Sequence, residues 1–320
     1  MAKPVAHSYG KDAVSVYRIE GDNLFACEAR VIARGDAFET SYTDGDNSLV
    51  VATDSMKNFV HRMGLEYEGD TLEGFVALVG GRLLESYEHM DGVQVAARQV
   101  PFERVRGNVL RRRYDDYAVA ELDLGRDGIV SARSGWKGLH LIKLTGSSFA
   151  GFVRDEYTTL PEAEDRPLFV HMDLHWTNAD QSRCARCEDV RDLAVSTFCE
   201  IRSASIQELV YQIGERLLET FSEIATVDFY AENRLWDMAQ QGEGASVYTD
   251  ARPPFGVITL TLERGSSPPA STGRPARRTA ATPAGSSPRR SAAASRSRFC
   301  SRLPSRRSST SSATSSATAT

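Results

Sequence analysis

The feature that most constrains the fold is an order of predicted elements that occurs twice along the 320-residue chain. In the first half, alternating apolar residues predict strands over residues 13–18 and 25–34. Thr53, Asp54 and Ser55 can cap a helix that ends near residue 63, and a second helix is expected over about residues 71–89. A strand then returns over residues 93–105.

The second half predicts the same succession. Strands are expected over residues 117–124, 138–145 and 168–176, helices over 189–200 and 203–221, and late strands over 226–236 and 255–262. Each half thus has a hairpin, two helices and returning strands. This repeated order predicts an α+β fold built from a duplicated antiparallel module. The repetition is one of element order, without a clear residue-level repeat.

Residues 266–320 differ from the rest of the chain. They hold ten arginines and no acidic residue, and Phe299 and Leu303 are their only large apolar side chains. This composition cannot bury enough apolar surface to offset the entropy of ordering the segment. We therefore expect folded domains over residues 8–112 and 113–264 and a disordered Ser/Ala/Arg/Thr/Pro-rich tail over 265–320.

The charge balance of residues 1–265 is acidic, with 28 Lys and Arg against 43 Asp and Glu. This balance argues against a nucleic-acid partner for the folded body. The chain has no run of eighteen apolar residues and no apolar signal-peptide core, so no membrane span is expected. Five irregularly spaced cysteines favour a reducing compartment. The prediction is a cytoplasmic protein without a membrane partner.

The segment over residues 139–166 carries the strongest functional signal. It alternates like a strand, turns at Gly146 to deliver Phe149, and ends at Arg166 after an acidic run over 161–165 that predicts a short helix. An aromatic ring and a planar guanidinium fork suit a flat, anionic, hydrogen-bonding heterocycle. The alternative is a strand, loop and helix with one core Phe and one surface Arg.

This segment resembles the signature of the urate oxidase (uricase) family, and the resemblance covers roughly residues 8–264. Further similar blocks follow in the family's order: Tyr9-Gly10-Lys11-Asp12, residues 39–48, residues 50–58, Ser205-Ile206-Gln207 and Asn233. The resemblance implies tandem tunnelling-fold (T-fold) domains, in which antiparallel sheets with helices on one face join from several subunits into a barrel.

The resemblance also implies oxidation of urate by O2 and water to 5-hydroxyisourate and hydrogen peroxide, without a metal or organic cofactor. Phe149 would stack on the substrate, Arg166 would pair with it bidentately, and Gln207 would read its opposite edge beside the Ile206 N–H group. The assembly implied is a homotetramer with active sites between subunits.

A neighbouring subunit would supply the remaining groups of the implied site. Thr53 would hold O2 or water above the substrate, with Asn233 on the other side of that small space. Lys11 would activate Thr53, since a desolvated lysine can take a proton. Asp54 would contact the substrate through its backbone N–H group.

The chain departs from the family's pattern at Leu235, where the family has a histidine that completes a proton relay. A leucine cannot relay a proton. The alternative function is therefore a weakened purine- or pterin-binding homologue. A second alternative is a zinc-stabilised structural protein, because His171 and His175 with Cys184 and Cys187 are residue types that bind zinc. On a strand the two histidines share a face but lie about 13 Å apart.

Overall fold

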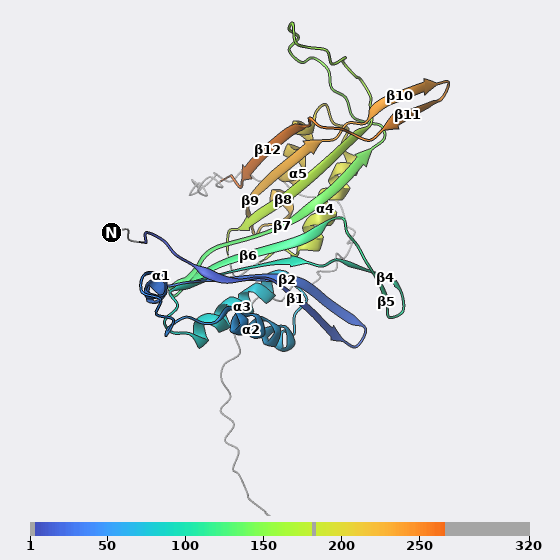
Figure 1. Cartoon of the computed structure of the whole chain (residues 1–320). Coiled ribbons are helices and arrows are strands. Elements are labelled where there is room, and N and C mark those ends of the chain that lie inside the picture. Colours follow the sequence, from blue (N-terminus) through green and yellow to red (C-terminus); the bar gives the residue numbers. More distant parts are fainter. Residues whose placement is uncertain (1–3, 181–183, 266–320) are drawn as a thin grey trace, which may run out of the picture. The chain divides into compact units, whose positions relative to one another are not determined.

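The computed structural model describes residues 4–180 and 184–265, and its centre is one eight-stranded antiparallel sheet (Figure 1). The strand order is β1-β2-β3-β6-β7-β8-β9-β12. These strands are β1 (Tyr9–Glu20), β2 (Asn23–Arg34), β3 (Gly92–Gln99), β6 (Tyr117–Gly125), β7 (Gly128–Lys143), β8 (Leu168–Asn178), β9 (Ile224–Asn233) and β12 (Gly256–Glu263). The predicted tail, residues 265–320, lies outside the described residues except for Gly265.

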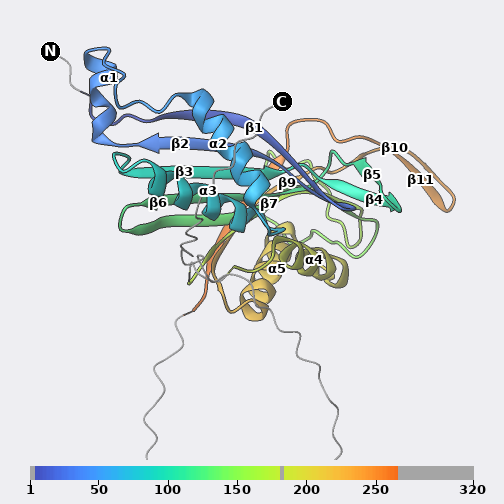
Figure 2. The same ribbon diagram turned by 90° about the horizontal axis from the view of Figure 1, so that it is seen from below.

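Four helices cover one face of the sheet (Figure 2): α2 (Thr53–Glu66), α3 (Leu72–Ser86), α4 (Cys187–Glu200) and α5 (Ile206–Thr220). Burial alternates along the strands, so that Leu174 and Trp176 of β8 are buried beneath helices while His171 and His175 face the other side. A short turn and helix, Asp36–Phe38 and α1 (Glu39–Thr43), precede α2. The α+β prediction with helices on one face is confirmed.

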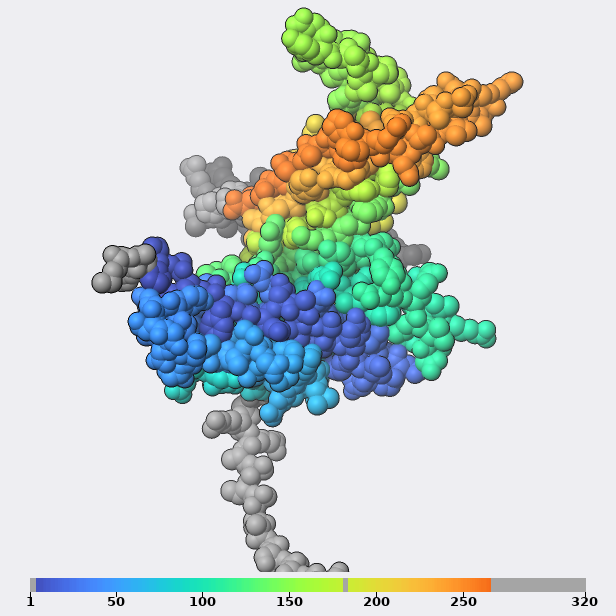
Figure 3. All heavy atoms as spheres, in the orientation of Figure 1, coloured from blue at the N-terminus to red at the C-terminus, as the bar shows by residue number. Residues whose placement is uncertain are grey.

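Two hairpins and one long loop extend away from the sheet (Figure 3). The hairpins are β4 (Phe102–Arg106) with β5 (Val109–Arg112), and β10 (Asp237–Gly242) with β11 (Ala245–Thr249). The loop joins β7 to β8. Within the described part of the chain, no helix is long and apolar enough to cross a membrane.

The two halves also share one run of similar residues, in addition to the repeated order of elements. Helices α3 and α5 each have 15 residues, and Gly80-Gly-Arg-Leu-Leu-Glu-Ser86 of α3 matches Gly214-Glu-Arg-Leu-Leu-Glu-Thr220 of α5. Each helix is capped by a hydroxyl, since Thr71 accepts from the Gly74 N–H group and Ser205 from the Glu208 N–H group. Equivalent residues of the two helices are 134 positions apart.

The same spacing relates α2 to α4 and β3 to β9, and it becomes 138 for β6 and β12 because the second hairpin is longer. Arg126, after β6, donates to three carbonyls at the end of α3, those of Leu84, Tyr87 and Met90. Arg264, after β12, donates to the carbonyls of Phe221 and Ile224 at the end of α5. The repeat therefore includes matched hydrogen bonds as well as matched elements.

Three local predictions are wrong. The strand expected over 93–105 ends at Gln99, because Pro101 lacks an N–H group and a hairpin begins at Phe102. Residues 161–165 form no helix: Ala163 pairs with Phe149, and the Asp165 carboxylate accepts from the Gly146 and Ser147 N–H groups. Thr53 does not cap α2; Ala52 holds that position and Thr53 is the first helical residue.

The halves share one sheet, because β6 of the first pairs with β7 of the second along nine residue pairs. The boundary between residues 112 and 113 stays a prediction. We call the region where β6 meets β7 the internal junction, since it joins the fourth strand of the first half to the first strand of the second.

Candidate active site

The first group of predicted site residues lies at the start of the first half. Lys11 is on β1, beside a bulge at which Ala13 has φ 56°, and Thr53 and Asp54 open α2. The Asp54 carboxylate accepts from Lys57 Nζ at 2.5 Å, and this hydrogen bond, followed by the charge of Lys57, lowers the pKa of Asp54. The first N–H groups of α2, which include those of Thr53 and Asp54, have no acceptor within the helix.

Phe149 and Arg166 lie together in the long loop after β7. The N–H group of Arg166 donates to the Ser147 carbonyl at 2.8 Å, and Phe149 exchanges backbone hydrogen bonds with Ala163. The Arg166 guanidinium carbon lies 5.5 Å from the centroid of the Phe149 ring. Burial lowers the pKa of Arg166, and among the described residues its buried Nε atom has no hydrogen-bond partner.

Ile206 and Gln207 are brought to the same loop by the connection between α4 and α5. The Ser203 carbonyl accepts from the Ser148 N–H group at 2.9 Å, and Ser203 pairs with Ser147. Ile206 is the first residue of α5, where N–H groups lack helical acceptors, and the next residue, Gln207, is exposed.

Asn233 completes this second group at the end of β9. It pairs with Val170, four residues after Arg166, and its buried Oδ1 atom also has no partner within the described chain. Five predicted site residues thus lie at one end of the second half: Phe149, Arg166, Ile206, Gln207 and Asn233. They supply an aromatic face, a guanidinium fork, a side-chain amide and free N–H groups.

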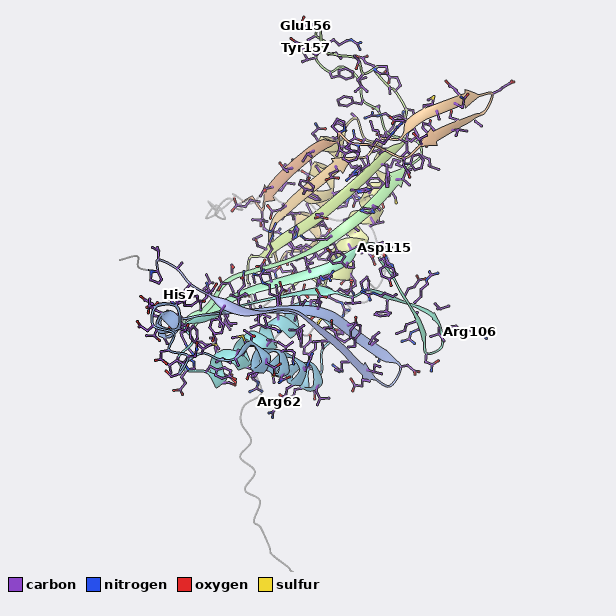
Figure 4. All side chains as sticks on the ribbon, viewed as in Figure 1. His7, Arg62, Arg106, Asp115, Glu156 and Tyr157 are labelled. Atoms are coloured by element: carbon purple, nitrogen blue, oxygen red, sulfur yellow. The ribbon has the colours of Figure 1, made fainter. Side chains whose placement is uncertain are left out.

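The two groups lie far apart within one chain. Lys11 is level with Ala132 of β7 through the successive pairs Lys11–Val31, Val31–Val95, Val95–Leu122 and Leu122–Ala132. The loop with Phe149 starts beyond Lys143, eleven residues further, which is about 35 Å along the strand. Figure 4 shows the same separation, with His7 and the loop residues Glu156 and Tyr157 at opposite ends.

At the internal junction, residues from the two halves of the chain line one cavity. A cavity of about 110 Å³ opens there between the N-terminus of α3 and the N-terminus of α4. Leu72, Glu73 and Gln99 line it from the first half, and Cys187 and Glu188 from the second.

Each of these five residues is the repeat counterpart of a predicted site residue. Leu72, Glu73 and Gln99 correspond to Ile206, Gln207 and Asn233 of the second half, 134 positions later. Cys187 and Glu188, which open α4, correspond to Thr53 and Asp54, which open α2. The counterparts of the two separated groups therefore line one cavity.

Register extends the correspondence to Lys11. Lys11 pairs with Val31 and Trp136 with Leu174, and both residues directly precede a bulge with a positive φ, at Ala13 and Gly138. The Trp136 indole donates to the Cys187 carbonyl at 2.5 Å. Only Phe149 and Arg166 have no counterpart, because the turn between β1 and β2 has just two residues, Gly21 and Asp22.

The proposed zinc ligands do not converge. His171 stacks on His140 at 3.6 Å between ring centroids, on the sheet face without helices. Cys187 is buried on the helix side, where its Sγ atom donates to Glu73 Oε1 at 2.9 Å. Within residues 4–180 and 184–265, no three His, Cys, Asp or Glu side chains form a group that could hold a metal ion.

Comparison with known proteins identifies the class. The family model described as Uricase matches residues 7–121 and 132–259, and the chain belongs to the uricase family. The uricase of Haloferax volcanii is 38% identical over 302 residues, which cover 81% of this chain and 98% of that protein. The resemblance inferred from the sequence motifs is confirmed.

Other relatives are longer. The chain is 42% identical over 255 residues to the uric acid degradation bifunctional protein PucL of Bacillus subtilis, covering 72% of this chain and 52% of PucL. It thus spans about half the length of this relative and of a similar bifunctional protein of Bacillus sp. TB-90. The crystal structure of a uricase from Bacillus fastidious is 36% identical, with a TM-score of 0.75 over 81% of this chain and 94% of that one.

Sequence reasoning missed the cavity at the internal junction and its residues Glu73, Gln99 and Glu188, and it assigned Cys187 only to a possible zinc site. The signal that reveals them is the shared Gly-x-Arg-Leu-Leu-Glu-Ser/Thr run of α3 and α5. That run sets the spacing of 134 residues that relates Glu73, Gln99, Cys187 and Glu188 to their counterparts.

Proposed function

We propose that this chain is a urate oxidase that converts urate, O2 and water to 5-hydroxyisourate and hydrogen peroxide. The observation that carries the proposal is the Phe149–Arg166 pair, whose guanidinium group has a buried Nε atom without a partner among the described residues. A flat anion stacked on Phe149 can accept two hydrogen bonds from Arg166, while Gln207 reads its other edge.

The repeat supports an assembly in which this site is completed between chains. Strands β1 and β12 end the sheet, and they are the first strand of one half and the fourth strand of the other. We propose that β12 of one copy pairs with β1 of the next as β6 pairs with β7. Ala118 pairs with Trp136 in the internal junction, so Gly256 would pair with Lys11 of the next copy.

This pairing sets the residues of two copies around one substrate. Thr53 and Asp54 of the next copy would face Gln207 and Asn233 as Cys187 and Glu188 face Glu73 and Gln99. The apolar side chains Tyr17 and Ile19 on β1 and Val257 on β12, now 48%, 76% and 56% exposed, lie on the strands that would pair. Two T-fold domains per chain, a barrel of several chains and a cytoplasmic homotetramer are part of this proposal.

Proton transfer in this proposal rests on Lys11 and Thr53. The substrate loses a proton as it is oxidised, and the Thr53 hydroxyl, which does not cap its helix, is available to hold O2 or water above the ring. Leu235 takes no part in the relay because a leucine side chain cannot donate or accept a proton; it is half-buried and packs against the hydrophobic core. The reaction needs no metal or organic cofactor in this scheme.

A direct assay tests the proposal. The purified chain should remove urate absorbance and release one hydrogen peroxide per urate consumed. Tight urate binding without turnover would instead favour the weakened purine- or pterin-binding homologue, to which Leu235 points.

A further inference from the structure

The cavity at the internal junction has the architecture of the proposed urate site but different chemistry. Glu73 stands where the urate site has Gln207, and Glu188 stands where it has Asp54. Asp70 also lines the cavity, and the clamp arginine has no counterpart. The cavity therefore lacks the clamp arginine and the Gln207 amide of the urate site, and three carboxylates line it.

The walls of the cavity suit a flat molecule. Phe25 and Phe102 line it with Leu24, Leu72 and Val100, so that apolar surface lies beside the carboxylates. The volume of about 110 Å³ leaves room for a small planar molecule, because one ordered water needs only about 10–15 Å³ of such space. Glu188 is exposed at the open side of the cavity, and partial desolvation raises the pKa of its carboxyl group.

One of the three carboxylates, that of exposed Asp70, already has a cationic partner in Arg186. Arg186 Nη2, from the residue before α4, is 3.3 Å from Asp70 Oδ2. Glu73 accepts from Cys187 Sγ through one oxygen, and a carboxylate has about four lone-pair directions for further donors. A planar cation with parallel N–H groups matches a carboxylate bidentately.

We propose that the internal junction is a second binding site, for a small planar organic cation of the guanidinium or aminoheterocycle class, held by Glu73 and Glu188 between Phe25 and Phe102. The proposal goes beyond the urate oxidase activity and rests on that proposed function only for the identity of the counterpart residues. It predicts one such site in every chain, distinct from the site between chains.

Calorimetric titration with 2-aminoimidazolium, a flat cyclic guanidinium, tests this site in the full-length chain. One equivalent should bind per chain, and equal concentrations of sodium or urate should not displace it. Glu73→Gln keeps an acceptor for Cys187 and should weaken binding at least tenfold, as should Glu188→Gln. Glu85→Gln, on the exposed face of the same helix, should change the affinity less than twofold.

Three results would overturn the proposal: no saturable binding, equal binding by Glu73→Gln and wild type, or displacement by sodium at equal concentration. Urate turnover separates this test from that of the proposed function. A chain that binds 2-aminoimidazolium without oxidising urate would contradict only the urate oxidase proposal. A chain that oxidises urate without binding 2-aminoimidazolium would contradict only the second site.

Discussion

The two junctions of the repeat use one scaffold for two kinds of chemistry. In the internal junction the helix starts of α3 and α4 present Glu73, Cys187 and Glu188. In the proposed junction between chains, the equivalent starts of α5 and α2 present Gln207, Thr53 and Asp54. The loop from β7 to β8 adds Phe149 and Arg166 to the second junction alone. We infer from this comparison that the loop, and not the shared scaffold, would make the second junction an anion site.

The largest effect expected is that of removing the clamp. Arg166→Ala should lower kcat/KM for urate about 10³-fold, or about 4 kcal/mol, because a bidentate charge-assisted pair is lost. Arg154→Ala, in the same loop and exposed, is the matched control and should leave kcat/KM within twofold. Steady-state kinetics and urate titration measure both. Retained micromolar urate affinity in Arg166→Ala would contradict the assignment of the clamp.

The next effect separates Thr53 from its counterpart Cys187. Thr53→Ala should lower kcat about 10²–10³-fold with little change in urate affinity, since the hydroxyl acts on O2 or water. Cys187→Ala should leave kcat within twofold and lower the free energy of unfolding by about 1–2 kcal/mol, because a buried hydrogen bond to Glu73 is lost. Equal losses of affinity and kcat in Thr53→Ala would argue against its place above the ring.

A smaller expected effect is a pH dependence of stability that comes from His175 in the second half. Burial, and then the charges of Arg133 and Lys137, lower the pKa of His175 to about 4, whereas its counterpart in the first half is Ile32. The unfolded chain takes up this proton near pH 6.5 and the native chain does not. Stability is therefore lost as pH falls, by about 2 kcal/mol between pH 7.5 and 5.

Urea unfolding of His175→Gln at these two pH values measures that loss. The variant should lack about 2 kcal/mol of the wild-type difference between pH 7.5 and 5. His140→Gln, at an exposed histidine on the neighbouring strand, serves as the control. An unchanged pH dependence in His175→Gln would show that His175 is not the group responsible.

The smallest effect concerns the matched arginines. Arg126→Ala should lower the free energy of unfolding by about 2 kcal/mol and Arg264→Ala by about 1 kcal/mol, since they donate to three and two helix-end carbonyls. Denaturant titration compares them with Arg82→Ala, which removes a half-exposed residue of α3 that forms an ion pair with Glu85. Equal free energies of unfolding for all three variants would show that the hydrogen bonds of Arg126 and Arg264 do not stabilise the two halves.

Apolar periodicity predicted most helices and strands of both halves, because their apolar faces are regular. The predictions failed where a side chain binds loop backbone or where a residue interrupts a strand. The acidic run over 161–165 has the composition of a first helical turn, but Asp165 binds the backbone of the loop around Gly146 instead. The strand over 93–105 failed at Pro101, which ends the ladder.

The sequence predicted the two groups of candidate site residues, but not how far apart they lie within one chain. Motifs identified Lys11 and Thr53 as well as Phe149 and Arg166, but only strand register shows that about 35 Å of sheet separates them in one chain. The repeat suggests how the two groups come together between chains. Its spacing changes from 134 to 138 residues along the chain. Its similarity is clear mainly in α3 and α5, so element order alone did not reveal it.

The central claim is that one chain's clamp works with the next chain's Thr53, and subunit mixing tests it most directly. Arg166→Ala and Thr53→Ala chains, each inactive alone, are unfolded together and reassembled in equal amounts. Random pairing makes about one site in four from two intact contributions, so about a quarter of wild-type activity should return. A mixture that assembles normally and stays inactive would contradict the claim, because each site would then belong to a single chain.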